Sequence, residues 1–424
     1  MYNKIIDKIK KKKINISIIG LGYVGLPLTI GFLKKNFKVQ VIEKNLEKIK
    51  LINSNKSPIK HISNKEIKNL KKKKFSISSN YKNIASSDII IICLPTPMTK
   101  TFSPDMSLIK ESFNKLTKYT KPYQTIILES TVYPGATRDI FYKKINSKFE
   151  IGNNFFLAYS PEREDPGNKN SNMNKVTKLI SGATDKCLKI AENLYSNAFK
   201  KVYKLSSIEV CEMTKLYENI YRSVNIGMAN EMKVILDKLN LDIYEVIKAA
   251  KTKPFGFHPF YPGPGLGGHC IPIDPHFLTW VANKKKIDTK FIQLSAKINR
   301  KMPNYIFKKL KKILNSHDNR YVLILGAAYK KNIDDTRESP FIHFSKILIK
   351  NKIKFKFHDP YVNQIYLNNK KFYSSNLTIK LIKNANVTVI LTDHDAINYR
   401  LVKKYSSKIL DTRGKFKPNN INIF

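Results

Sequence analysis

The stretch from Tyr261 to Pro275 brings together residues that could carry out covalent chemistry. It reads YPGPGLGGHCIPIDP and places the thiol of Cys270 in a glycine-rich turn, four residues before the carboxylate of Asp274. Its glycines, Gly267 among them, leave little side-chain bulk in front of the thiol, so a ligand could come close. A cysteine kept for packing would normally lie in an apolar run. The pattern fits a covalent nucleophile with an acid in reach, and it fits equally well a Gly/Pro loop in which Cys270 is incidental.

A lysine and an amide on one helix face form a second candidate group. Val210–Leu239 has few turn signals and carries apolar residues at helical spacing, which predicts a long helix that joins two domains and packs against a partner chain. Lys215 and Asn219 stand four residues apart in it and share one face. A cation beside an amide suits a developing oxyanion. A solvated helix face is the alternative, and without further context it is the stronger one.

A dinucleotide-binding pattern lies near the N-terminus. The β-rich run Ile14–Ile19 leads into GLGYVG and the apolar run Leu26–Leu33, and a second β-rich run ends at Glu43. This predicts strand, tight turn, helix and strand, with the acid 18 residues after the last glycine. The turn would cradle a pyrophosphate and the acid would accept ribose hydroxyls, which favours NAD over NADP. The contacts predicted in the turn are Gly20, Gly22, Tyr23, Val24 and Gly25.

The same segment could be mistaken for a membrane anchor. Ile14–Leu33 has no charged residue and follows the basic run Lys10–Lys13. Its glycines and Pro27 favour a buried strand and helix instead. No other segment is long and apolar enough to cross a bilayer, so we expect a soluble protein without stable membrane insertion.

Several later apolar runs end in polar or proline loops, as the strands of a doubly wound sheet do. Residues 88–94 lead into Pro95 and Thr96, residues 124–128 into Glu129-Ser130-Thr131, and residues 155–158 into YSPERED. In such a sheet these loops line the cofactor cleft. Thr131, Glu162 and Arg163 are therefore candidates for its wall, with simple loop caps as the alternative.

The α/β pattern returns after a second helical stretch at about 289–315. Apolar runs at 321–325, 353–357, 386–391 and 408–410 each end in polar residues, which predicts a second parallel sheet. Lys330, Arg337 and Arg413 are well placed there to bind phosphates or the edge of a uracil ring. The second sheet lacks a full GxGxxG, so the two α/β parts are not a tandem repeat.

These patterns together predict an α/β fold with two Rossmann-like, doubly wound parallel-sheet domains joined by a central helical region with a long helix. We expect an NAD-binding domain at 1–205, a helical dimerisation domain at 206–310 and a C-terminal α/β domain at 311–424, to which the family resemblance given below assigns UDP-sugar binding.

Composition argues against a disulfide-rich or metal-binding protein and leaves nucleic-acid or anionic-membrane binding as an alternative. The chain has 424 residues and four widely spaced cysteines without a CxxC pair, which argues against a disulfide scaffold or a metal site and fits a reducing cytoplasm. Its net charge of +45 suggests nucleic-acid or anionic-membrane binding. However, the basic runs are scattered and rich in lysine, and no nucleic-acid-binding motif accompanies them. A diffusely cationic surface that attracts anionic nucleotides is the favoured interpretation, so we expect no nucleic-acid partner.

Eight segments in order resemble the UDP-sugar and GDP-mannose 6-dehydrogenase family along nearly the whole chain. They are GLGYVGLPL, CLPTP, ESTVYPGAT, YSPER, KLYENIYRSVNI, GPGLGGHCIPIDP, GAAYKKNIDDTRESP and DTRG. The resemblance implies a four-electron oxidation of a sugar C6 alcohol to a carboxylate with two NAD+, for surface polysaccharide synthesis. The aldehyde formed first would be captured by a thiolate as a thiohemiacetal, oxidised to a thioester and released by water.

The resemblance also assigns roles to single residues. Cys270 matches the nucleophile, Lys215 and Asn219 match the oxyanion-stabilising pair, and Asp274 with Thr131 matches positions that order a water. Glu162 matches the acid linked to thioester hydrolysis.

Other matching positions bind cofactor or substrate. Lys330 and Arg413 match sugar-nucleotide contacts, the latter lent by a second subunit of at least a homodimer, and Arg337 matches a residue near the cofactor phosphates. The remaining matches are Pro95 and Thr96 for the cofactor and Glu162, Arg163, Lys215, Asn219, Tyr261 and Gly267 for the substrate.

Departures within the family bear on the sugar. UDP-glucose dehydrogenases resemble GGSC followed by a lysine, whereas this chain has GGHC followed by Ile273, and Arg163 follows Glu162. These departures resemble the UDP-N-acetylhexosamine branch, notably UDP-N-acetylglucosamine 6-dehydrogenases. UDP-glucose and UDP-N-acetylgalactosamine stay as alternatives, and Glu164 and Asp165 are both candidates for a second hydrolytic acid.

Overall fold

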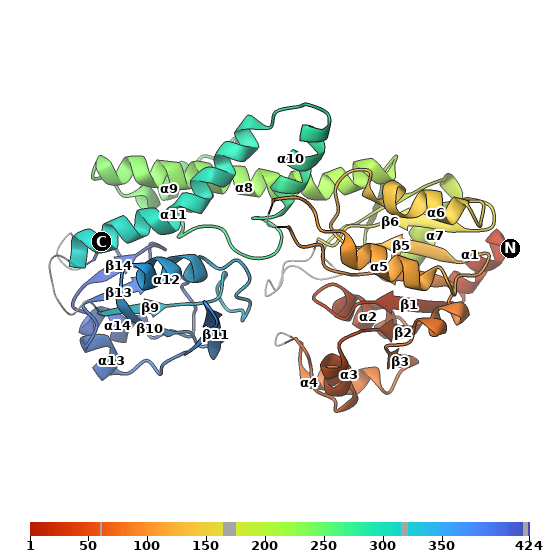
Figure 1. The fold of residues 1–424 in the computed structure, drawn as a ribbon, viewed down its shortest axis with the longest axis horizontal. Coiled ribbons are helices and arrows are strands. Elements are labelled where there is room, and N and C mark those ends of the chain that lie inside the picture. The colour runs from red at the N-terminus through yellow and green to blue at the C-terminus, as the bar shows by residue number, and fades with distance from the viewer. Residues whose placement is uncertain (60–61, 100, 164–174, 315–320, 419–422) are drawn as a thin grey trace. The chain divides into compact units, whose positions relative to one another are not determined.

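The structure is a computed structural model that describes residues 1–59, 62–99, 101–163, 175–314, 321–418 and 423–424. The chain divides into two units (Figure 1). The first contains Met1–Glu218 and His276–Lys286, and the second contains Asn219–Pro275 and Ile287–Phe424. The division into three domains that the sequence suggests stays a prediction.

The first unit is built on an eight-stranded sheet in the order β3-β2-β1-β4-β5-β6-β7-β8. The strands are β1 (Asn15–Ile19), β2 (Lys38–Ile42), β3 (Phe75–Ser78), β4 (Ile89–Ile92), β5 (Thr125–Leu128), β6 (Phe156–Tyr159), β7 (Lys178–Gly182) and β8 (Val202–Lys204). The first six run parallel in the 3-2-1-4-5-6 order of dinucleotide-binding folds. β7 runs antiparallel to β6, so this edge of the sheet is mixed rather than parallel. Strands β4, β5 and β6 are wholly buried, which explains their nearly unbroken apolar sequences.

Helix α1 precedes β1, and further helices lie between the strands of this unit (Figure 1). They are α1 (Tyr2–Lys10), α2 (Gly25–Lys34), α3 (Leu46–Asn53), α4 (Asn64–Leu70), α5 (Ser107–Leu116), α6 (Lys143–Asn146) and α7 (Asp185–Ser196), with short helical turns η1 (Tyr81–Ser86) and η2 (Arg138–Tyr142). The predicted strand–turn–helix–strand is confirmed as β1, α2 and β2. The segment that could be mistaken for a membrane anchor therefore forms a buried strand and helix. Among the residues that the structure describes, no helix is long and apolar enough to span a bilayer.

Four helices make up the middle of the sequence: α8 (Ile208–Lys238), α9 (Ile243–Ala250), α10 (Asp274–Lys284) and α11 (Lys290–Leu314). The predicted long helix is confirmed as α8, whose residues pass from the first unit into the second at Glu218 and Asn219. The basic runs lie on different elements: at the end of α1, after α4, at the end of α10 and within α11.

The second unit contains a four-stranded parallel sheet in the order β10-β9-β13-β14. Its strands are β9 (Tyr321–Leu325), β10 (Lys354–His358), β13 (Val387–Ile390) and β14 (Ile409–Asp411), and a hairpin of β11 (Gln364–Leu367) and β12 (Lys370–Tyr373) lies apart from them. Alternate residues of β9 serve two cores. Val322 and Ile324 pack with α11 and α12 (Pro340–Lys350), whereas Leu323 and Leu325 pack with α13 (Ile379–Lys383) and α14 (Tyr399–Tyr405). Helices therefore cover both faces, as expected for a doubly wound sheet.

Candidate active site

The glycine-rich turn after β1 is closed on its protein side and open toward solvent. Gly20 has a φ of +96°, and a Cβ placed on Gly25 would lie 1.9 Å from the Gly20 carbonyl oxygen. A Cβ on Gly22, in contrast, would meet nothing within 4 Å. Close packing at Gly20 and Gly25 brings α2 against β1, and the open space at Gly22 is where a pyrophosphate needs to approach the backbone. The turn therefore fits a dinucleotide.

The carboxylate of Glu43, at the end of β2, is fixed beside this turn. Its two oxygens accept the backbone N–H groups of Leu21, at 2.8 Å, and Asn45, at 2.9 Å, and the Lys48 Nζ lies 3.9 Å away. A carboxylate has further lone pairs after two such bonds. Glu43 can thus still accept ribose hydroxyls, in the position predicted for it.

The loops that follow β4 and β5 are tied together. The N–H of Leu94 donates to Ser130 Oγ at 3.0 Å, and Thr96 Oγ1 donates to the carbonyl of Thr131 at 2.6 Å. Pro95, between them, is exposed. These bonds hold the predicted cofactor contacts Pro95 and Thr96 next to the predicted catalytic Thr131.

A glutamate of α8 that the sequence did not reveal fixes the rest of the Thr131 loop. Glu212 is fully buried and accepts the N–H of Gly135 at 2.6 Å, and the N–H and Oγ1 of Thr137 at 2.9 Å and 2.6 Å. Burial raises the pKa of Glu212 to about 7 despite these donors. In the sequence, the segment YPGAT after Thr131 indicated a loop. It did not reveal Glu212, because Glu212 lies 75 residues after Thr137.

Glu162, the predicted hydrolytic acid, belongs to an ionic cluster with Glu129 and Lys178. Lys178 Nζ donates to Glu129 Oε2 at 2.7 Å and lies 3.8 Å from Glu162 Oε2. The hydroxyl of Tyr195 donates to the other oxygen of Glu129. Burial opposes the charge on Lys178, but the two glutamates together raise its pKa, so the lysine is a cation. Sequence reasoning missed Lys178 because a lysine that begins a strand normally faces solvent.

Arg163 is engaged within the first unit. Its guanidinium forms two hydrogen bonds with the carboxylate of Glu218 in α8 and one, at 2.8 Å, with the carbonyl of Thr177. A bidentate pair of this kind orients the side chain strongly. Glu164 and Asp165, the two candidates for a second hydrolytic acid, lie outside the described residues.

The structure brings together three of the predicted catalytic residues in the second unit. Asp274, at the start of α10, accepts a hydrogen bond of 2.5 Å from Asn219 Nδ2. The backbone N–H of Asp274 donates to the carbonyl of Cys270 at 2.8 Å. The thiol and the acid therefore lie one helical turn apart. Asn219 and Asp274 are 5% and 2% exposed. Lys215, one helical turn before Asn219, is 8% exposed, so a solvated helix face does not explain this pair.

Cys270 differs from the other cysteines in its exposure. Cys93, Cys187 and Cys211 are buried, and Cys270 is half-buried. Burial raises the pKa of the Cys93 thiol well above its usual value and that of Cys211 to about 12, so both stay protonated and unreactive. Cys270 is therefore the cysteine with access to a substrate.

The glycine-rich turn before Cys270 packs on the loop after β9. The N–H of Gly268 donates to the Arg337 carbonyl at 2.9 Å, and Gly268 has a φ of +88°. A Cβ on Gly267 would lie 2.4 Å from Tyr329 Cβ, and one on Gly268 would lie 2.9 Å from the Tyr329 ring. Side chains at these two positions would thus push the cysteine turn off Tyr329.

The predicted sugar-nucleotide residues lie in the second unit. The guanidinium of Arg413 donates to the Leu391 carbonyl at 2.7 Å, and its Nη1 would be 2.8 Å from a Cβ on Gly263 of the same chain. Arg337 is ion-paired with Asp335 at 2.6 Å. Tyr261 is 51% exposed. Burial, followed by the charge of Arg337, lowers the pKa of His269 and keeps this ring neutral at pH 7.

The predicted catalytic residues are thus divided between the units: Thr131, Glu162 and Lys215 belong to the first, and Asn219, Cys270 and Asp274 to the second. Lys330 belongs to the second unit as well. Their roles in catalysis and binding stay predictions.

Comparison with known proteins matches three family models along the chain. Residues 14–199 match the NAD-binding domain of the UDP-glucose/GDP-mannose dehydrogenase family, residues 209–301 its central domain and residues 323–418 its UDP-binding domain. Protein CapL of Staphylococcus aureus is 33% identical over 96% of this chain and 98% of its own length. The UDP-N-acetyl-D-glucosamine 6-dehydrogenase of Pseudomonas aeruginosa is 31% identical over 83% of this chain and 84% of its own.

A solved structure supports the same assignment. The UDP-D-ManNAc dehydrogenase of Pyrococcus horikoshii superimposes with a TM-score of 0.84 at 30% identity, covering 96% of both chains. The resemblance that the eight motifs suggested is therefore confirmed, and so are the two-sheet fold and NAD as the cofactor. This chain is a member of the UDP-glucose/GDP-mannose dehydrogenase family.

Proposed function

We propose that the protein oxidises the C6 alcohol of a UDP-N-acetylhexosamine to the carboxylate, with two NAD+ per sugar, through a thiohemiacetal and a thioester on Cys270. The observation that carries this proposal is the group formed by Asn219, Asp274 and Cys270. A half-buried thiol there stands one turn before a buried carboxylate that is bonded to an amide. These are the groups that acyl transfer to and from sulfur requires.

The residues of the chain divide the chemistry between them. NAD+ bound at the Gly20–Gly25 turn supplies the acceptor for one hydride in each of two oxidations. Asp274, held by Asn219, orders the water that takes the proton of the C6 hydroxyl. The Cys270 thiolate then adds to the aldehyde carbon, so that a C–S bond forms and the carbonyl oxygen becomes an oxyanion next to Lys215 and Asn219.

Release of the product requires the C–S bond to break. After the second oxidation the acyl group is a thioester, and a water that loses its proton to Glu162 attacks the carbonyl carbon. The thiolate leaves, because it is a good leaving group, and the sugar departs as a uronic acid. The cation of Lys178 lies 3.8 Å from Glu162 Oε2.

We propose UDP-N-acetylglucosamine as the substrate. His269 and Ile273 next to the nucleophile, and the similarity to the Pseudomonas aeruginosa enzyme, support this choice. Its C2 epimer, UDP-N-acetylmannosamine, is the second candidate, because the Pyrococcus horikoshii structure carries that name and matches over more of the chain.

The test is NADH formation with a panel of UDP-N-acetylglucosamine, UDP-N-acetylmannosamine, UDP-N-acetylgalactosamine and UDP-glucose. We expect two NADH per molecule of an acetamido sugar, and fastest turnover of UDP-glucose would contradict the proposal. Cys270→Ser should abolish acid formation, whereas Cys187→Ser, which removes a buried thiol, serves as the matched control. Full acid formation by Cys270→Ser would rule out the thioester route.

A further inference from the structure

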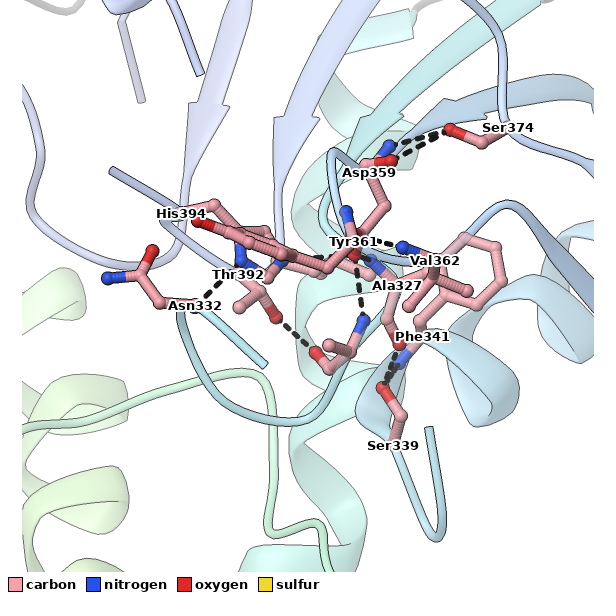
Figure 2. A network of polar contacts seen from close by, with 12 residues as sticks. Ala327, Asn332, Ser339, Phe341, Asp359, Tyr361, Val362, Ser374, Thr392 and His394 are labelled. Carbon is pink, nitrogen blue, oxygen red and sulfur yellow. Dashed lines mark hydrogen bonds and ion pairs between the residues drawn. The ribbon is translucent and has the colours of Figure 1, made fainter. Parts of the chain in front are cut away.

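His394, in the loop after β13, is a fully buried histidine that joins two other loops (Figure 2). Its Nδ1 accepts the backbone N–H of Asn332 at 2.9 Å, and its Nε2 lies 3.0 Å from Asp359 Oδ2. A backbone N–H can only donate, so Nδ1 carries no proton and the ring proton is on Nε2, where it is donated to Asp359. The ring is therefore held in one tautomer with both nitrogens occupied.

The three loops that meet at His394 lie at the carboxyl edge of the second sheet. Asn332 follows β9, Asp359 follows β10 and His394 follows β13. The strand order is β10-β9-β13, so successive connections leave β9 in opposite directions. Parallel α/β sheets bind ligands in the crevice at such a switch point. The Asn332–His394 bond joins the two loops that border this crevice.

Asp359 fixes the beginning of the β9 loop. Its Oδ2 accepts the N–H groups of Ala327 at 2.7 Å and Ala328 at 3.0 Å, and its Oδ1 accepts those of Tyr361 at 2.8 Å and Val362 at 2.9 Å. Figure 2 shows the carboxylate at the centre of these bonds. A carboxylate with this many donors is rigidly oriented.

The end of the β9 loop is fixed as well. Asn332 Nδ2 donates to Asp395 at 2.6 Å, and Lys331 forms an ion pair with Asp395 at 2.8 Å. Lys330, the predicted sugar-nucleotide contact, thus stands between a segment held by Asp359 and a segment held by His394 and Asp395.

We propose that His394 and Asp359 are positioning residues for the nucleotide of the substrate: they hold the loop 326–332 in the shape in which it binds UDP. This inference rests on the proposed function in one respect, namely that the second unit binds the UDP part of a UDP-sugar. The bond from His394 to Asn332 is the one that matters for binding, because it joins the two loops that border the crevice.

Two substitutions of one residue separate the two bonds of the ring. In His394→Asn the amide oxygen takes the place of Nδ1 and still accepts from Asn332, while the link to Asp359 is lost. In His394→Gln the amide nitrogen takes the place of Nε2 and donates to Asp359, while the N–H of Asn332 is left unpaired. Comparison of the two variants therefore shows which of the two hydrogen bonds supports the binding of UDP.

The experiment is calorimetric titration of the full chain with UDP, and separately with NAD+. We expect His394→Gln to weaken UDP binding about tenfold, the effect of one lost hydrogen bond to a buried donor, and His394→Asn to stay within about threefold of the wild type. In turnover, His394→Gln should raise the KM for the UDP-sugar while kcat stays within about twofold. NAD+ binding should be the same in all variants.

Thr388→Val is the control for general loss of stability. It removes a buried hydroxyl of β13 that bonds at 2.9 Å to Ser406, the residue directly after α14, and should leave UDP binding unchanged. The inference is wrong if His394→Gln binds UDP like the wild type, or if Thr388→Val or His394→Asn loses as much affinity as His394→Gln. A wild-type protein that binds UDP but oxidises no UDP-N-acetylhexosamine would contradict the proposed function alone, since the titration still decides the inference.

Discussion

Each unit contains a buried carboxylate close to its predicted site, but the two carboxylates have different kinds of partner. Glu129 in the first unit is bonded by side chains, Lys178 and Tyr195, which lie 49 and 66 residues away. Asp359 in the second unit is bonded by four backbone N–H groups and by His394.

The pKa values of the two carboxyl groups move in opposite directions. Burial raises the pKa of Glu129 even though Lys178 is adjacent. For Asp359 burial acts in the same direction, but the hydrogen bond from His394 and the backbone donors outweigh it and lower the pKa to about 2. Backbone donors are present whatever the side chain, proline excepted, and need no second charge, so they hold an ionised group more securely. Glu129 thus depends on a single cation, whereas Asp359 organises the loops around it.

The largest loss of stability is expected from removing the cation of Lys178. Lys178→Met leaves Glu129 buried without its charged partner, which should lower the free energy of unfolding by about 3–5 kcal/mol. Urea unfolding of the full chain measures this loss. The double variant Lys178→Met/Glu129→Gln, which buries no charge at the pair, should recover at least half of it. A loss below about 1 kcal/mol in the single variant would show that the pair does not stabilise the unit.

A somewhat smaller loss is expected from neutralising the other carboxylate. In Asp359→Asn one oxygen becomes an NH2 group that faces backbone N–H donors, so two buried donors such as those of Tyr361 and Val362 lose their acceptor. We expect a loss of about 3 kcal/mol in urea unfolding. An equally stable variant would mean that the loop does not depend on the carboxylate, and the comparison above would fail.

At low pH the free energies of unfolding of the wild type and Asp359→Asn should become more alike. The folded pKa of Asp359, about 2, lies below the ordinary value, so its contribution is complete above about pH 4 and is lost as the pH falls toward 2. The gap between the two unfolding free energies should narrow by about 2 kcal/mol between about pH 5 and pH 2. Unfolding curves at several pH values test this, and a gap independent of pH would contradict the depressed pKa.

The smallest effect is expected for an exposed counterpart of Lys178. Lys204, in the neighbouring strand β8, pairs with Glu192 at 2.9 Å, but its side chain is 55% exposed. A double-mutant cycle on Lys204 and Glu192 should give a coupling below about 1 kcal/mol. A coupling as large as that of Lys178 with Glu129 would show that burial is not what separates the two pairs.

Much of the fold could be predicted from the sequence because parallel strands covered on both faces are unbroken apolar runs. Strands β4, β5 and β9 were found within a residue or two in this way, and so was the α8 helix by its spacing. The strand β7 was missed because it begins with Lys178, and the hairpin β11–β12 because its second strand, KKFY, looks like surface. In both cases tertiary contacts decide against the local pattern.

The site was predictable only as far as motifs reach. Asn219, Cys270 and Asp274 were singled out and the structure brings them together. Glu212 and Lys178 could not be found, since each acts through a partner that lies about 50 or more residues away in the sequence. Asp359 and His394 were visible as polar residues at strand ends, but their backbone partners leave no trace in residue types.

The packing of Gly267 and Gly268 on Tyr329 has a consequence for protein engineering. Because no side chain fits between the cysteine turn and the loop after β9, these segments form a matched pair, although about 60 residues of chain separate them. A chimera that takes residues 323–418 from a relative with another sugar preference would therefore also have to take residues 263–268 from that same relative. Hybrids that exchange only one of the two segments should misplace the thiol, whatever sugar nucleotide they accept.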